Sequence, residues 1–167
     1  MAKNRINRGK QFEDQIRSAL EAVPETAVDR LIDPQAGYAG VGNICDFQVY
    51  HYPHEFYLEC KSCYGNTLSI HTNNPKNKYG AVSNTQWEGM LKHSYVAGVV
   101  AGVFIWFIDH DITIFVPIQT LERVRNEGAK SINIRNLKPL NYEYYIVPAT
   151  KKRVLFEYDL LNFLGGN

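Results

Sequence analysis

The segment that most constrains the fold is ICDFQVYHYPHEFYLECKS, residues 44–62, in which two apolar-rich runs flank the dipeptide Tyr52-Pro53. Runs of this length that alternate in polarity are typical of strands with one buried face, and the short break between them predicts an antiparallel hairpin. We therefore expect strands over residues 44–50 and 55–62. A chain that contains such a hairpin must cover it with a second layer of structure.

The predicted hairpin brings two carboxylates together. A turn at Tyr52-Pro53 places Asp46 directly opposite Glu59, with Cβ atoms roughly 5 Å apart. Like charges at that separation are destabilising unless a proton or a cation lies between them. Mg²⁺ meets this need, because it binds a few carboxylates, keeps several waters and contacts phosphate oxygens.

Lys61 completes a chemically coherent set. Side chains alternate along a strand, so Lys61 shares a face with Glu59, whereas Cys60 lies on the other. An ammonium in that position can orient an attacking water or stabilise charge that develops on a phosphate. Two acids and a lysine therefore indicate phosphodiester hydrolysis, although the residues alone leave open a surface hairpin with ordinary charges.

The remaining pattern predicts an α/β (α+β) domain around one mixed sheet. Helical spacing of Phe12, Ile16 and Leu20 marks the first helix. The expected elements are a helix over residues 8–23, a strand over 27–32, a helix over 84–95 capped by Asn84, a hairpin of 97–108 with 112–116, a helix over 118–125, strands near 131–134, 142–147 and 154–156, and a final helical turn. Residues 64–83 read as a long polar loop, and loops of that length are often functional.

Four positions in order resemble a known nuclease family. The pattern Asp-x(12)-Glu-x-Lys, here Asp46, Glu59 and Lys61, is that of the PD-(D/E)XK superfamily. The segment NRGKQFEDQI resembles the first helix of RecU-type Holliday junction resolvases, whose acidic residue matches Glu13. Gln86, in SNTQWEGM, resembles the glutamine that follows the active strand in that family. The apolar hairpin AGVVAGVFIWFIDHDITIFVP fits its next core strands, so the resemblance covers residues 4–118.

The resemblance implies a restriction-endonuclease-like core, a mixed sheet flanked by helices, in one nuclease domain over residues 1–167. It implies a Mg²⁺-dependent homodimer, with Mn²⁺ as a substitute, that resolves four-way DNA junctions in recombination and repair. The implied catalytic residues are Glu13, Asp46, Glu59, Lys61 and Gln86. Asp46, Glu59 and the Cys60 carbonyl would bind the metal, and Glu13 would hold a water of its shell or a second ion.

Two departures from the family leave the DNA substrate open. The segment VDRLIDPQAG stands where cellular RecU proteins have a lysine- and proline-rich stretch, and the loop from Lys61 to Gln86 is longer than expected. We interpret the chain as a compact, divergent, phage-encoded member. The alternatives are a restriction-type or repair nuclease on duplex or flap DNA, and a non-catalytic DNA-binding recombination protein.

The formal net charge of +1 excludes a uniformly basic nucleic-acid coat but not a polarised one. The expected DNA contacts are Lys3, Arg5, Arg8 and Lys10 in a basic arm over residues 1–10, and Lys76 and Lys78 in the long loop. Residues 123–153 are also rich in Lys and Arg.

The sequence gives no sign of another chemistry. No P-loop or Gly-rich nucleotide motif occurs, so we expect no nucleotide cofactor. A zinc site built on Cys60-x-x-Cys63 with Cys45 and nearby histidines lacks the pairing of a structural site, so buried thiols are favoured. Three cysteines and no long apolar segment predict a cytoplasmic protein without a membrane partner. The resemblance to RecU-type resolvases implies that the cell is a bacterial host.

Overall fold

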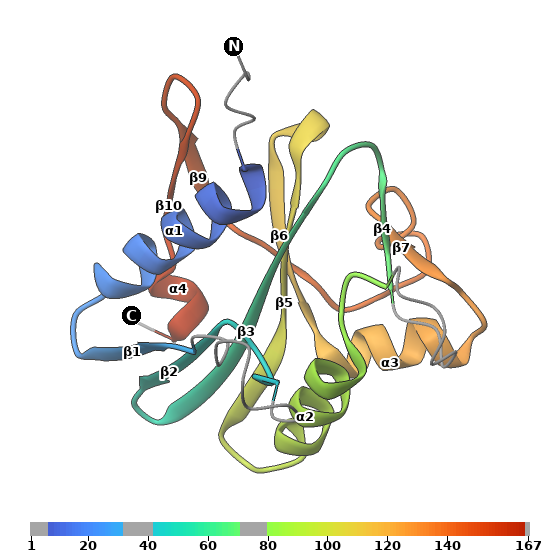
Figure 1. The fold of residues 1–167 in the computed structure, drawn as a ribbon, viewed down its shortest axis with the longest axis horizontal. Helices are drawn as coiled ribbons and strands as arrows, with labels where there is room; N and C mark the ends of the chain where they lie inside the picture. The colour runs from blue at the N-terminus through green and yellow to red at the C-terminus, as the bar shows by residue number, and fades with distance from the viewer. Residues whose placement is uncertain (1–6, 32–41, 71–79, 166–167) are drawn as a thin grey trace.

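The chain folds around a six-stranded mixed sheet, seen in a computed structural model that describes residues 7–31, 42–70 and 80–165 (Figure 1). The strands, in spatial order, are β1 (Thr26–Arg30), β2 (Phe47–His51), β3 (His54–Cys63), β5 (Val99–Phe107), β6 (Ile112–Pro117) and β8 (Tyr145–Ile146). Only β3 and β5 run parallel among these neighbours. The fold class predicted from the sequence, a mixed sheet flanked by helices, is therefore confirmed.

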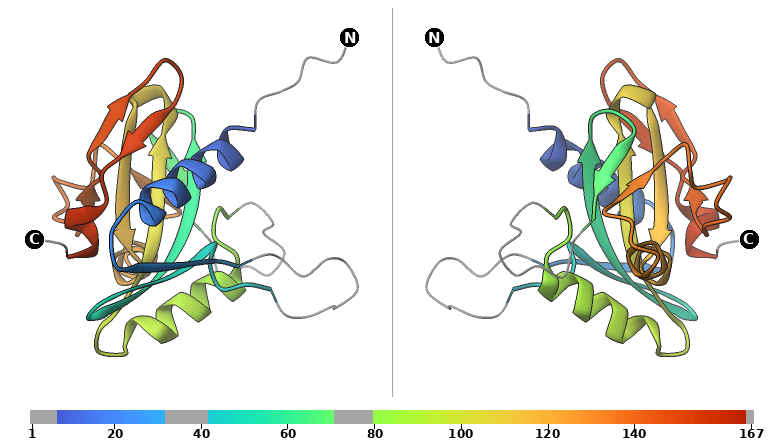
Figure 2. Two further views of the ribbon diagram at one scale, coloured as in Figure 1. Left: turned by 90° about the vertical axis from the view of Figure 1, so that its left-hand side faces the viewer. Right: turned by 90° about the vertical axis from the view of Figure 1, so that its right-hand side faces the viewer.

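The two faces of the sheet carry different elements. One face packs against α1 (Arg8–Glu21), α4 (Leu161–Leu164) and the hairpin of β9 (Ala149–Lys151) and β10 (Phe156–Tyr158), which lie to the left in Figure 1. The other packs against α2 (Asn84–Ser94), α3 (Ile118–Asn126) and the small sheet of β4 (Thr67–Ser69) and β7 (Ser131–Asn133). A 3-10 turn, η1 (Ile108–His110), joins β5 to β6, and Figure 2 shows the layers from both sides.

The β2–β3 hairpin has the predicted register, since Phe47 pairs with Leu58 and His51 with His54. Alternation along β3 sends Tyr57 into the core under α2 and Leu58 into the core under α1. Both faces of β3 are thus covered over its middle, and Glu59, which follows Leu58, is buried there.

Helix α1 forms for local reasons that the sequence shows. The Asn7 side chain accepts a hydrogen bond from the Lys10 N–H and caps the first turn. Phe12, Ile16 and Leu20 repeat at four-residue spacing and are fully buried against the sheet. Within the described ranges, no helix is long and apolar enough to cross a membrane.

Several local predictions need correction. Helix α2 is capped by Ser83 rather than Asn84, because Ser83 and Gln86 form a capping box. Part of the predicted polar loop over residues 64–83 is the strand β4, since Leu68 and Ile70 are buried in the core. Residues 71–79 of that segment lie outside the described residues. The strand β9 was not predicted, and β10 begins two residues later than the strand expected over 154–156.

Gly102 supplies a test of the packing between β5 and β6. A Cβ at this position would clash with the Val116 carbonyl oxygen and lie 2.6 Å from Cζ of the Phe115 ring. We expect Gly102→Ala to lower the free energy of unfolding by about 1–3 kcal/mol, as overpacked cores do. Gly42→Ala is the matched control, because its Cβ would only touch the Thr85 side chain at 3.7 Å. Equal stability of the two variants in urea unfolding would contradict the packing described here.

Candidate active site

The candidate site lies where β2 ends and β3 continues beside β5. The Asp46 N–H still donates to the Leu58 carbonyl at 3.1 Å, which is the last backbone contact between the two strands here. The Asp46 side chain then turns inward, and its Oδ2 accepts the Cys60 N–H at 2.8 Å. The pairing of β2 with β3 therefore stops one residue pair before the predicted Asp46–Glu59 pair. The Cys60 N–H is bound by the Asp46 side chain instead of by a backbone carbonyl of β2.

Glu59 is the most buried acid of the site, with 1% of its surface exposed. Its Oε1 accepts a hydrogen bond from Gln86 Nε2 at 2.8 Å and also contacts the Lys61 ammonium. Its Oε2 is buried and has no hydrogen-bond partner among the described residues. One oxygen is thus held by the protein, whereas the other is left for a proton or a cation, since leaving a buried polar atom unpaired is costly.

Burial and neighbouring charges have opposite effects on the pKa of Lys61, and both act on the pKa of Glu59. Burial raises the pKa of Glu59 to about 7, and the Asp46 charge adds to the rise, although Lys61 and Gln86 oppose it. Burial lowers the pKa of Lys61, but the charges of Glu59 and Asp46 outweigh it and leave that pKa above its ordinary value. Lys61 therefore stays an ammonium, and Glu59 changes its protonation close to neutral pH.

Gln86 is held by the start of α2. Its Oε1 accepts the Ser83 N–H at 3.0 Å, and the Ser83 hydroxyl oxygen accepts the Gln86 N–H at 3.3 Å. This capping box fixes the orientation of the amide, so that its NH₂ group points at Glu59. The sequence allows two interpretations of Gln86, as a residue of the helix start and as a residue near the site, and its contacts agree with both.

Glu13 reaches the same region from α1. Its Oε2 lies 2.8 Å from the Arg30 guanidinium, and burial raises its pKa, followed by the charge of Asp46. Arg30 pairs with Phe47 across β1 and β2, which places it beside Asp46 at the end of the strand. Sequence reasoning missed Arg30, because nothing local shows that β1 pairs with β2.

The other predicted residues divide into two groups. Arg8 and Lys10 lie in the first turn of α1, whereas Lys3, Arg5, Lys76 and Lys78 lie outside the described residues. The Cys60 carbonyl faces the Asp46 edge, because the N–H and C=O of one strand residue point to the same side.

Zinc has no support in the described part of the chain. No group of three or more His, Cys, Asp or Glu residues there could hold a metal ion. Cys45 and Cys60 are buried free thiols on opposite faces of the sheet. Burial raises the pKa of Cys45 to about 12, so it is not a reactive thiolate.

A divalent cation of the magnesium type fits better than zinc. Mg²⁺ needs only one or two protein carboxylates and keeps its other ligands as water or phosphate. Asp46 and Glu59 supply two carboxylates beside each other, and the buried Oε2 of Glu59 has no protein partner among the described residues. The residues present therefore fit such an ion.

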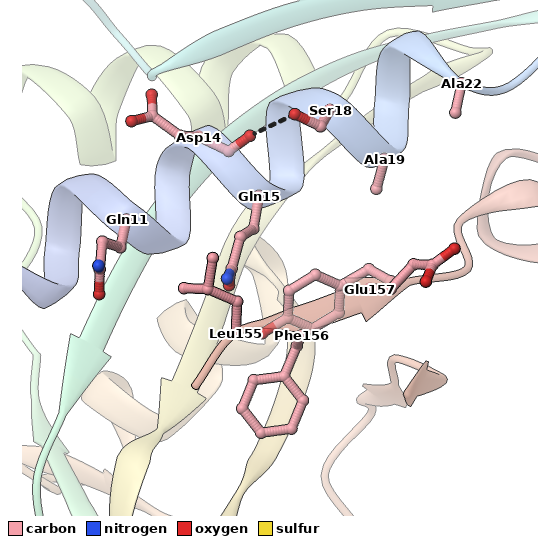
Figure 3. Close-up of a pocket in the computed structure, with 10 residues that line it drawn as sticks. Gln11, Asp14, Gln15, Ser18, Ala19, Ala22, Leu155, Phe156 and Glu157 are labelled. Carbon is pink, nitrogen blue, oxygen red and sulfur yellow. Dashed lines mark hydrogen bonds between the residues drawn. The ribbon is translucent and has the colours of Figure 1, made fainter. Parts of the chain in front are cut away.

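A separate groove in the described structure lies on the other side of α1. A cavity of about 560 Å³ runs between α1 and β10 and is lined by Gln15, Ser18 and Leu155, among others (Figure 3). Gln15 and Ser18 lie on the opposite side of α1 from Glu13, at 3.6 residues per turn.

Comparison with solved structures relates the fold to that of a resolvase. The chain is similar to Hjc of Archaeoglobus fulgidus, described as a Holliday junction resolvase from an archaeal hyperthermophile. The TM-score is 0.53 with 21% identity, over 79% of this chain and 93% of that one. This likeness shows the fold. No protein-family model and no curated protein matches the chain.

The protonation of Glu59 predicts a pH-dependent response to Mg²⁺. Because the pKa of Glu59 is raised to about 7 in the fold, this group stabilises the metal-free fold as pH falls through 7 and loses that effect as pH rises. A cation binds only the ionised carboxylate, so the rise in Tm caused by Mg²⁺ should be larger at about pH 8 than at about pH 6. Thermal unfolding with Mg²⁺ and with EDTA measures this. The Glu59→Gln variant should lose the Mg²⁺ effect, and an equal shift at both pH values would contradict the assignment.

Proposed function

We propose that this protein is a Mg²⁺-dependent DNA endonuclease that resolves four-way junctions, akin to the RecU-type resolvases in the cytoplasm of a bacterial host. The observation that carries the proposal is buried Glu59, with one oxygen held by Lys61 and Gln86 and the other without a partner among the described residues, beside Asp46. The fold shared with the archaeal Hjc resolvase supports the same class of activity.

In this proposal each side chain has a distinct task. Asp46, Glu59 and the Cys60 carbonyl would hold Mg²⁺, or Mn²⁺ in its place, and the ion's chemistry is to polarise the phosphate and acidify water. Lys61 holds its proton and would orient the attacking water or stabilise charge on the phosphate.

Two other residues would hold the site in place. Gln86 orients the Glu59 carboxylate through its amide. Glu13 would hold a water or a second ion, with Arg30 neutralising its charge when it is ionised.

A four-way junction as substrate leads us to propose a homodimer. Cutting two strands symmetrically requires two equivalent sites, which a two-fold homodimer provides. Arg8 and Lys10 would contact phosphates from the start of α1, and the basic arm before them would extend that contact.

One cleavage experiment separates the proposal from its alternatives. The protein is incubated with a mobile four-way junction, a linear duplex and a flap, each with Mg²⁺ and with EDTA. Symmetric Mg²⁺-dependent nicks in the junction alone are the expected result. Cleavage of the duplex or flap would favour a restriction-type or repair nuclease, and binding without cleavage would favour a non-catalytic DNA-binding protein.

Asp46→Asn tests the carboxylates directly. The amide oxygen of Asn can still accept the Cys60 N–H, so the fold should survive. We expect cleavage to disappear while junction binding in EDTA stays unchanged, because the amide lacks the charge that a hard cation needs. A cleavage rate equal to that of the wild type would refute the metal assignment.

Gln86→Ala separates the orientation of Glu59 from the capping of α2. Removal of the amide should lower the cleavage rate or the Mg²⁺ affinity about 10–100-fold, as loss of a partner of a metal ligand typically does. Ser83→Ala removes the cap but not the Glu59 contact, so it should cost about 1 kcal/mol of stability and leave cleavage close to wild type. Gln119→Ala, an exposed glutamine on α3, controls for the substitution itself. Equal cleavage by the Gln86 and Ser83 variants would contradict an orienting role.

A further inference from the structure

A small basic pocket lies at the end of the molecule where α1 begins. Its volume is about 190 Å³, and it is lined by Arg8, Trp106, Asp111, Lys151 and Arg153, among others. In Figures 1 and 2 the start of α1, the β5–β6 turn and the β9–β10 hairpin all lie toward the upper end. The fold thus joins two basic segments that are about 140 residues apart in the chain.

The charges of this pocket are not all paired within the protein. Lys151 forms an ion pair with Asp111 and lies 5.9 Å from the centre of the Phe156 ring, which fixes the hairpin. Arg8 donates to the neutral Gln11 side chain at 3.1 Å. Neither Arg8 nor Arg153 has a carboxylate partner within the described ranges. Two guanidinium groups beside one cavity therefore carry positive charge that a ligand can neutralise.

The wall of the pocket adds a hydrogen-bond donor. Trp106 lines it with 4% of its surface exposed, and its Nε1–H has no hydrogen-bond partner among the described residues. Buried N–H groups are normally paired, so this one also favours a polar occupant. An anion satisfies both the guanidinium groups and the indole N–H, because all of them are donors without acceptors.

The pocket lies on the α1 face of the sheet, because Trp106 packs in the core under α1, whereas Glu59 lies on the face under α2. Arg8 precedes Glu13 by five residues, about 7.5 Å of helix rise. Trp106 pairs with Ser62, three residues beyond Glu59 and thus about 10 Å along β3. Arg8 is also turned by about 140° from Glu13 around α1, so the pocket and the acidic residue lie on different sides of that helix.

We propose that this pocket binds a backbone phosphate of the DNA, with Arg8 and Arg153 as its ligands. The inference rests on the proposed nuclease function and adds to it a DNA contact from the C-terminal hairpin. Guanidinium groups suit this role, because they pair with phosphate oxygens through two parallel hydrogen bonds. Such a contact would fix the register of the DNA on the enzyme but read no sequence.

The test measures DNA binding without cleavage. Affinity for a four-way junction is determined in EDTA at several salt concentrations for the wild type, Arg8→Gln, Arg153→Gln and the double variant. Each single change should weaken binding about tenfold and reduce the slope of log K against log salt by about one. Arg135→Gln, an exposed arginine outside the pocket, is the matched control and should keep both values.

The double variant tests whether the two arginines share one phosphate. The combined loss should be smaller than the product of the single losses, because the second change removes a contact already broken. A full product of the two losses would overturn the single shared phosphate. If Arg153→Gln bound the junction as tightly as the wild type, the proposal that the pocket binds a phosphate would be overturned. A loss of affinity in Arg135→Gln equal to that in the pocket variants would overturn it as well.

These outcomes are distinct from failure of the proposed function. If the wild type binds and cuts the junction but Arg8→Gln and Arg153→Gln leave affinity and salt slope unchanged, only the pocket is refuted. If the wild type neither binds nor cuts branched DNA, the proposed function fails, and the pocket proposal fails with it. Circular dichroism and thermal unfolding of each variant ensure that a loss of binding is not a loss of fold.

Discussion

The rest of the site depends on the burial of one carboxylate, that of Glu59. A charge taken out of water is costly unless it is paired or becomes protonated, and here Lys61 and Gln86 pair only one of its two oxygens. The neighbouring Asp46 makes the ionised form less favourable still. The metal-free arrangement is therefore held against its own electrostatics, and the proposed divalent cation would relieve this conflict.

The secondary structure explains how such an arrangement can persist. Both faces of β3 are covered, by α1 on one side and α2 on the other, so the strand cannot turn Glu59 toward water. β2 ends beside it, which frees the β3 edge for the Asp46 side chain. The capping box at Ser83 aims Gln86 at the same carboxylate. Three local features therefore determine the surroundings of Glu59: the covered strand β3, the early end of β2 and the cap of α2.

The β2–β3 hairpin and its register could be predicted because alternation and a two-residue break leave little freedom. The positions of Asp46, Glu59 and Lys61 followed from it. Arg30 could not be found in this way, since its place beside Asp46 depends on the pairing of β1 with β2, which no local pattern encodes. The β4 strand was hidden because only Leu68 and Ile70 interrupt a polar stretch. The capping role of Ser83 was visible as Ser three residues before Gln, and Asn84 was the wrong choice of cap.

A net charge of +1 conceals a polar distribution that the fold makes useful. Acids gather at the β3 edge, where Glu13, Asp46 and Glu59 influence one another, and cations without acidic partners in the described ranges gather one to two turns of α1 away. A phosphate-rich polymer is repelled by the first group unless a cation is bound there, but attracted by the second. In the proposed nuclease, the basic end would dock DNA before metal binds at the acidic end, so that binding and hydrolysis would be separable properties.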